Sequence, residues 1–382
     1  MIQRGVATFG LDYGKCPPWL FDRMVSLGRE MVRVMAAEYG PDEFIKRIAD
    51  PVWFQSLGTV LAFDWNASGL TTILTAALKE AIRGEERELG IFICGGKGKT
   101  SRKTPDEING WGYRLDMDPA TTQALSYNSK MAAKVDSALI QDGYQLYHHA
   151  FFFSRNGHWA VIQQGMNTEA GSARRYHWHS DTVKDLVCEP HAGIFSDARA
   201  RDVLNLAAKE STTTRSLSTE LVSQSFGALM KDVTILRSHA SKLSQVVSVA
   251  AGPETLTLMN LESREFTTHP VVSEDFSKSR YLEKILSKLC SDRPGSYESL
   301  LATKGVGGKT VRALALVGEI LYGAKPSYED PARYSFAHGG KDATPYPVDR
   351  GTYDATISTM KEVVRKTRLP AADKARIIQR LV

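Results

Sequence analysis

The chain has 382 residues, of which 42% are hydrophobic and 24% charged, as in an ordinary globular protein of two or three domains. No apolar run approaches the about 20 residues of a membrane span, and the first residues lack the apolar segment of a signal peptide, which argues against a membrane or secreted protein. The four cysteines have no regular spacing, which favours reduced thiols and a cytoplasmic location.

The net charge of +5 is unevenly distributed along the chain. Residues 276–382 contain 19 Lys and Arg against 11 Asp and Glu, whereas the remainder is slightly acidic. A basic C-terminal third is typical of a segment that meets a polyanion. An ordinary solvated face has the same composition, so both interpretations stay open.

Residues 17–90 predict mainly helices, because apolar residues recur there at helical spacing. The next stretch, "LGIFICGGKGKTSRKT" (89–104), predicts a short buried strand and then a basic, glycine-rich loop. A P-loop needs G-x-x-x-x-G-K-[ST], and Ile93 occupies its first glycine position, which argues against an NTPase. The loop is either a surface loop or a nucleic-acid contact made by Lys97 and Lys99.

The clearest sheet signal is a hairpin. "YQLYHHAFFFS" (144–154) and "HWAVIQQGM" (158–166) flank the turn Asn156-Gly157, and a helix that ends near Gly143 precedes them. A helix followed by a hairpin also suggests a restriction-type nuclease, in which Asp136 or Asp142 would help to bind Mg²⁺ or Mn²⁺. Two glutamines stand where the E-x-K of such an enzyme is expected, which weakens this interpretation.

"SARRYHWHSD" (172–181) alternates basic and aromatic residues. Arg174 and Arg175 beside aromatic rings suit phosphate contact and base stacking, although buried strand histidines are an equally good interpretation. His177 and His179 would point to the same side of a strand, but no third ligand is identifiable. No metal site is therefore predicted.

Residues 198–250 predict further helices, and a turn-containing segment leads from them into the basic third. We therefore predict a mixed α+β fold in three parts. These are an α/β domain with a hairpin-containing sheet at 1–195, a helical and connecting region at 196–275, and a basic domain at 276–382.

"YESLLATKGVGGKTVRALALVGEILYG" (297–323) predicts two helices joined by a tight turn. It resembles the helix-hairpin-helix motif, in which glycines let the backbone approach a phosphate and the second helix presents its N-terminal N–H groups. Such contacts position DNA without reading its sequence. The resemblance leaves room for a monovalent cation at the hairpin. The predicted phosphate-binding residues here are Lys304, Gly305, Gly307, Gly308, Thr310 and Arg312.

Residues 305–310, "GVGGKT", together with the later "PYPVDRGTYDATISTMKEVVRK", resemble segments of helix-hairpin-helix base-excision DNA glycosylases. The resemblance implies that Lys309 attacks the sugar C1′ while Asp349 stabilises the positive charge that develops. This reaction requires no cofactor, but the attacking amine must be neutral. Asp349 also stands where an ordinary helix N-cap would stand. Candidates for a pocket that holds the extruded base are Tyr176, Trp178, Phe336, His338 and Tyr346.

The prediction is thus a DNA-processing enzyme, a base-excision glycosylase with lysine-dependent lyase activity on abasic (AP) sites in damaged duplex DNA. One alternative is a metal-dependent, structure-specific nuclease that uses the hairpin only to hold DNA. A second is a non-catalytic nucleic-acid-binding protein, for which RNA stays open. No membrane partner is predicted, and the sequence leaves the oligomeric state open.

Several further segments, "GGKGKTSRKTP", "QDGYQLYHHAFFF", "PHAG" and "YSFAHGGKDATPYPV", resemble a prokaryotic family catalogued as domain of unknown function 763. This resemblance covers nearly all of the chain. It implies little chemistry, so the function has to be argued from the site.

Overall fold

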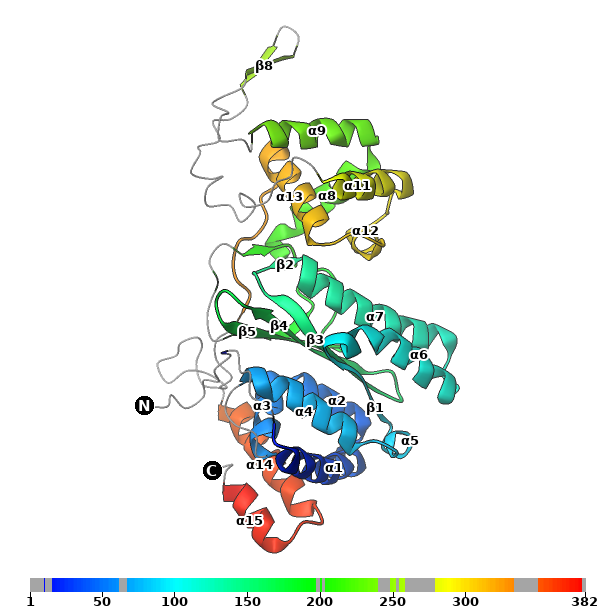
Figure 1. The fold of residues 1–382 in the computed structure, drawn as a ribbon, viewed down its shortest axis with the longest axis vertical. Coiled ribbons are helices and arrows are strands. Elements are labelled where there is room, and N and C mark those ends of the chain that lie inside the picture. The colour runs from blue at the N-terminus through cyan, green and yellow to red at the C-terminus, as the bar shows by residue number, and fades with distance from the viewer. Residues whose placement is uncertain are drawn as a thin grey trace, which may run out of the picture.

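The computed structural model describes residues 10, 16–61, 67–196, 200, 203–239, 248–251, 254–257, 279–332 and 350–379. Its centre is a five-stranded antiparallel sheet in the order β1-β3-β4-β5-β6, with helices on both faces and a helical module at one end (Figure 1). The strands are β1 (Ile91–Lys97), β3 (Gln145–Ser154), β4 (Trp159–Asn167), β5 (Ser172–His179) and β6 (His191–Phe195). This confirms the predicted mixed α+β fold.

The predicted hairpin is the middle of this sheet. β3 and β4 pair in register from Phe153 opposite Trp159 to Gln145 opposite Met166, with one irregularity between Leu146 and His148. Gly157 in the connecting turn has φ +89°, a conformation that glycine adopts without strain.

One face of the sheet is covered by the N-terminal helices. These are α1 (Pro18–Tyr39), α2 (Pro41–Ala49), α3 (Pro51–Val60) and α4 (Ala67–Ala81), and the short α5 (Glu86–Leu89) leads into β1. A proline opens each of the first three helices, and Asp50 caps α3 by accepting the backbone N–H groups of Val52 and Trp53. Ile91, Ile93 and Phe152 bury their side chains in the core on this face.

The opposite face is covered by α6 (Thr104–Arg114) and α7 (Pro119–Ala138), which follow the 3-10 helix η1 (Gly98–Lys103). Phe92, Phe151 and Phe153 pack on this side, so alternate residues of β1 and β3 enter different cores. Because both faces are covered, residues 91–94 of β1 and 150–153 of β3 form continuous apolar runs rather than an alternation of polar and apolar residues.

A helical module continues the second core on the side of the sheet that α6 and α7 cover (Figure 1). It follows a small two-stranded pairing of β2 (Ile140–Gln141) with β7 (Leu204–Asn205). The module comprises η2 (Lys209–Ser211), α8 (Thr212–Ser223), α9 (Phe226–His239), α11 (Arg280–Asp292), α12 (Tyr297–Ala302) and α13 (Gly308–Tyr322), with a separate hairpin of β8 (Ser248–Ala251) and β9 (Glu254–Thr257). Its centre is α13, which packs against α8, α9 and α11.

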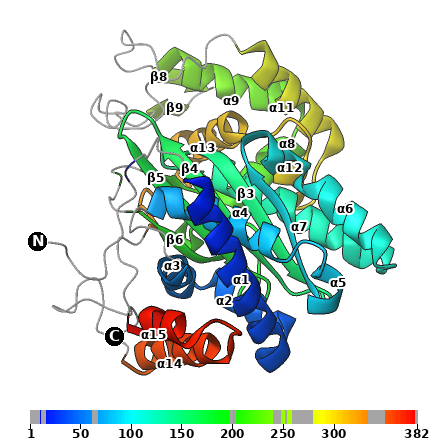
Figure 2. The ribbon, with the colours of Figure 1, turned by 60° about the horizontal axis from the view of Figure 1, so that its bottom comes forward.

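The C-terminal third is divided between two layers. Helices α11–α13 belong to the helical module, whereas α14 (Arg350–Lys366) and α15 (Ala371–Gln379) lie beside the N-terminal helices, where α14 contacts α1 (Figures 1 and 2). Met360, Val363 and Val364 are fully buried in that core, which is why α14 packs there. No helix in the described part of the chain is both long and apolar enough to cross a membrane.

Candidate nucleic-acid interface

The two helices predicted around the glycine-rich turn are present as α12 and α13. A capping box formed by Ser296 and Ser299 starts α12, and the turn at residues 303–307 leads directly into α13. Gly305 has φ +99°, and a Cβ atom there would lie 2.5 Å from Cδ1 of Ile285. Only glycine fits this position, so the sequence sets the shape of the turn.

The protein holds the carbonyl groups of this turn firmly. The Tyr281 hydroxyl donates to the Gly305 carbonyl (3.1 Å), and Lys134 Nζ donates to the carbonyls of Leu301 and Thr303, the latter at 2.7 Å. On the far side, Gln141 Nε2 donates to the Gly308 carbonyl (3.0 Å). Helices α7 and α11 and the strand β2 therefore hold the turn.

Lys134, in α7, has a perturbed pKa. Burial and the positive charge of Lys288 lower the pKa of Lys134 to about 8. No sequence signal marks this residue, because it lies in the amphipathic helix α7, far from the turn in the chain. Its hydrogen bonds make it an anchor of the turn.

The N–H side of the turn is open. The backbone N–H groups of Gly307, Gly308 and Lys309 have no hydrogen-bond acceptor among the described residues. A Cβ atom built on Gly307 would meet no atom within 4 Å, and the side chains of Lys304 and Lys309 are exposed beside it. Unpartnered N–H groups at a helix start, flanked by cations, form an arrangement that attracts an anion.

Two other predicted residues of this motif face the protein instead. Thr310 is 2% exposed. Arg312 donates from Nε to the side chain of Gln141, so this contact joins α13 to β2. Both residues stabilise the position of α13. Thr310 is buried, so the prediction that it contacts phosphate is wrong, whereas Arg312 is half-buried and its contact with phosphate stays a prediction.

Of the predicted catalytic pair, Lys309 and Asp349, only Lys309 belongs to the described part of the chain. Lys309 is exposed and forms no ion pair within the described part of the chain. Asp349 lies outside the described residues, as do three of the pocket candidates, Phe336, His338 and Tyr346.

The prediction that Arg174 and Arg175 contact nucleic acid is wrong for this structure. Both are fully buried, as are the pocket candidates Tyr176 and Trp178, because helices cover both faces of β5. Burial lowers the pKa of Arg175 to about 9, and its guanidinium lies 4.8 Å from the centre of the Phe54 ring.

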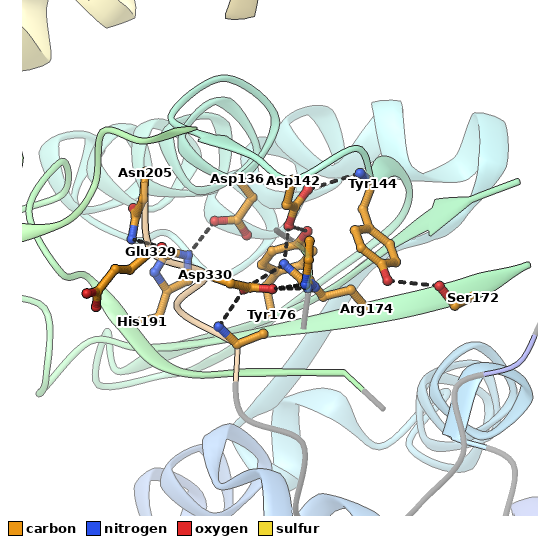
Figure 3. A network of polar contacts seen from close by, with 12 residues as sticks. Asp136, Asp142, Tyr144, Ser172, Arg174, Tyr176, His191, Asn205, Glu329 and Asp330 are labelled. Carbon is orange, nitrogen blue, oxygen red and sulfur yellow. Dashed lines mark hydrogen bonds and ion pairs between the residues drawn. The ribbon is translucent and has the colours of Figure 1, made fainter. Parts of the chain in front are cut away.

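Arg174 is the centre of a buried ion network (Figure 3). Its guanidinium donates to Asp142 (2.7 Å) and, through both terminal nitrogens, to Asp330 (2.8 and 3.0 Å). Tyr176 donates to the same Asp142 oxygen at 2.8 Å. Asp330 belongs to the chain segment after α13, so the network ties the helical module to β5.

Asp136 forms a second buried network. Its carboxylate lies 2.5 Å from His191 Nε2 and accepts from Gln163 Nε2 (2.5 Å) and Trp178 Nε1 (3.1 Å). Gln163 in turn contacts His149 Nδ1 at 2.8 Å. Sequence reasoning missed the Asp136–His191 pair, because 55 positions separate the two residues and only the fold brings them together.

These contacts bear on the alternative of a metal-dependent nuclease. Protein donors occupy both Asp136 and Asp142, the carboxylates on which that interpretation depends. Within the described ranges, no group of three or more His, Cys, Asp or Glu side chains could hold a metal ion. His177 donates from Nδ1 to the carbonyl of Ala49 (3.1 Å) instead of facing an open site.

The basic loop after β1 is exposed, as a contact with a polyanion requires. Lys97 and Lys99 are both exposed, and the Lys97 ammonium lies 5.8 Å from the centre of the Tyr147 ring. Lys79 donates to the Gly95 carbonyl (3.0 Å) and pairs with Glu107 (2.6 Å), which holds the base of the loop. Contact between this loop and nucleic acid stays a prediction.

Comparisons with known proteins bear on the family and not on the activity. No curated protein and no solved structure matches the chain, so the resemblance to helix-hairpin-helix glycosylases stays a prediction. A family model described as "Protein of unknown function (DUF763)" matches residues 5–348, most of the 382 residues. The chain therefore belongs to the DUF763 family.

Proposed function

We propose that this protein binds duplex DNA through its sugar–phosphate backbone, with the turn between α12 and α13 as a contact. The observation that carries the proposal is the open N–H edge at Gly307, Gly308 and Lys309, flanked by two exposed lysines. The anchored carbonyl side makes the edge rigid, so little conformational freedom is lost on binding. The four free cysteines favour a cytoplasmic location.

The turn offers a substitution that separates binding from folding. Gly307 has the extended dihedrals φ −151° and ψ −170°, and its surroundings are open, so Gly307→Val should leave the protein folded. A branched side chain there would keep a phosphate from the adjacent N–H groups. We expect the affinity for duplex DNA to fall about tenfold, because this factor corresponds to the free energy of one lost charge-assisted hydrogen bond.

Fluorescence anisotropy at several salt concentrations measures this effect. Lys309→Ala should lower the affinity for all DNA sequences alike and reduce the salt slope by about 1. Glu88 is exposed and distant in the sequence from the turn, so Glu88→Ala is the control for unspecific effects of a surface substitution. Unchanged affinity in both Gly307→Val and Lys309→Ala, with thermal unfolding as in the wild type, would remove the turn from the DNA interface. Tighter binding to single-stranded RNA would favour the RNA alternative.

We further propose that the protein acts on the DNA that it binds, as a glycosylase and AP lyase with Lys309 as its nucleophile. An amine attacks only when it is neutral, and desolvation favours that form. Lys309 is exposed in the free protein, so bound DNA would have to provide the desolvation. The proposal places Asp349 near the sugar in the complex, where it would stabilise the positive charge.

Borohydride trapping tests the lyase proposal directly. Duplexes with an abasic site, uracil, hypoxanthine or 8-oxoguanine are incubated with the protein in chelator, and a Schiff base is reduced to a stable adduct. We expect an adduct in the wild type that Lys309→Ala abolishes. An adduct that persists in Lys309→Ala would assign the chemistry to another amine, of which Lys134 is the first to test. Cleavage that needs Mg²⁺ or Mn²⁺ would support the nuclease alternative instead.

A further inference from the structure

The monovalent cation for which the sequence leaves room would have to meet carbonyl oxygens at the turn between α12 and α13. The carbonyls of Leu301 and Thr303 stand at the end of α12 and at the start of that turn. The last carbonyls of a helix lack intrahelical donors, so they need a donor or a cation from elsewhere. Backbone carbonyls that converge on one point are also the ligands that K⁺ takes in proteins. These two oxygens are therefore the place to test whether such an ion fits.

The ammonium group of Lys134 already bonds both oxygens. Lys134 belongs to α7, which packs beside α12 (Figure 1). Its Nζ donates to the carbonyl of Leu301 and, at 2.7 Å, to the carbonyl of Thr303. An ammonium is a compact positive charge with three donors and no acceptor, so it can replace an ion between carbonyl oxygens. The residues present therefore do not fit a separate cation at this point.

The surroundings of Lys134 also disfavour a further positive charge. Burial and the charge of Lys288 lower the pKa of Lys134 to about 8, so the ammonium is mostly protonated at pH 7 but already lies near a second cation. An ion on the same carbonyls would add a third charge to partly buried groups. The tether to α7 gives Lys134 a further advantage, because a free ion loses translational freedom when it binds.

The bonds to Lys134 reach the edge of the turn that faces outward. The Thr303 carbonyl also accepts from the N–H of Val306 (3.2 Å), and Gly307 follows directly in the chain. One carbonyl oxygen thus joins Lys134 to the backbone immediately before the open N–H groups. Lys134 is a positioning residue in this arrangement, because it contacts the turn and not the ligand of the turn.

We propose that the Lys134 ammonium takes the place of a bound monovalent cation at this turn, so that a residue of α7, and not K⁺ or Na⁺, shapes the N–H edge for its ligand. The consequence for DNA affinity rests on the function proposed above. The consequence for the shape of the turn does not, and the two are measured separately.

Hydrogen exchange at the Val306 N–H, followed by ¹⁵N NMR of the full chain at pH 7, tests the shape of the turn without DNA. The wild-type rate should be the same in potassium, sodium and tetramethylammonium chloride at equal ionic strength. Lys134→Ala should exchange about tenfold faster in tetramethylammonium, because its carbonyls have lost their donor, and n-propylammonium should restore most of the protection. A wild-type rate that depends on the ion, or an unchanged rate in Lys134→Ala, would overturn the proposal.

Fluorescence anisotropy with duplex DNA in the same salts tests the effect on binding. The wild-type affinity should not depend on which of the three cations is present. Lys134→Ala should bind about tenfold more weakly in tetramethylammonium, and both n-propylammonium and the conservative variant Lys134→Arg should restore binding. The comparison of salts in the wild type and the Lys134→Arg variant decide the question even if Lys134→Ala does not fold.

Lys130→Ala is the matched control, because Lys130 is an exposed lysine one helical turn earlier in α7. It removes the same charge, but Val306 exchange should stay as in the wild type and n-propylammonium should have no effect. A loss in Lys134→Ala that neither n-propylammonium nor arginine restores would mean that Lys134 only supports folding, which contradicts the proposal. The expected exchange rates without any DNA binding by the wild type would support the role of Lys134 and overturn the function proposed above.

Discussion

Replacing Arg174 with methionine is expected to lower the free energy of unfolding by about 3–5 kcal/mol. The guanidinium is fully buried and is the cation beside two carboxylates, Asp142 and Asp330, whose side chains are 0% and 3% exposed. Methionine keeps most of the volume of the side chain but leaves both carboxylates without their charge partner. Chemical denaturation followed by circular dichroism and tryptophan fluorescence measures the loss.

Two controls show whether burial is the cause. Arg83 pairs with Glu80 at 2.7 Å, but the Arg83 side chain is 69% exposed, so Arg83→Met should change stability by at most about 0.5 kcal/mol. The triple variant Arg174→Met, Asp142→Asn, Asp330→Asn removes all three charges and should recover part of the loss. Similar losses in Arg174→Met and Arg83→Met would show that burial of the ion network is not the cause.

Local patterns in the sequence were sufficient to predict several elements of the fold, although the stretch 198–250, predicted as helices, also contains the strand β7 and most of β8. The Asn156-Gly157 turn marks the hairpin of β3 and β4, and the glycines at 305 and 307 mark the turn between α12 and α13. These signals are local because backbone conformation and side-chain periodicity act over a few residues. The mixed α+β fold follows from them.

Residues that meet through tertiary packing could not be predicted in the same way. β5 alternates basic and aromatic side chains as an exposed binding strand would, and only the helices on both faces make Arg174 and Arg175 interior residues. Asp136 and His191 come together because α7 packs on β3 and β4 and its last turn brings Asp136 to His191 at the start of β6. The same holds for Lys134, whose partners in the turn lie 167 and 169 positions away.

Acid is expected to destabilise the centre of the sheet through its buried histidines. His148 is 1% exposed, and burial together with the nearby charges of His149 and Lys97 lowers its pKa to about 3. The unfolded chain has the ordinary histidine pKa of about 6.5. Between these values the unfolded state binds a proton that the folded state does not. The contribution of His148 to stability is thus complete above pH 6.5 and is lost as the pH falls towards 3.

Burial also lowers the pKa of His149 and His177, so these residues add to the same effect. Each such histidine contributes up to about 1.4 kcal/mol per pH unit to the slope of stability against pH below 6.5. Denaturation midpoints measured from pH 7 to pH 4 should therefore fall steeply. His148→Gln can keep the contact with Thr75 but does not titrate, and it should flatten the slope by about that amount. An unchanged slope in this variant would mean that the folded protein accommodates a charged His148, which its position between β1, β4 and α4 argues against.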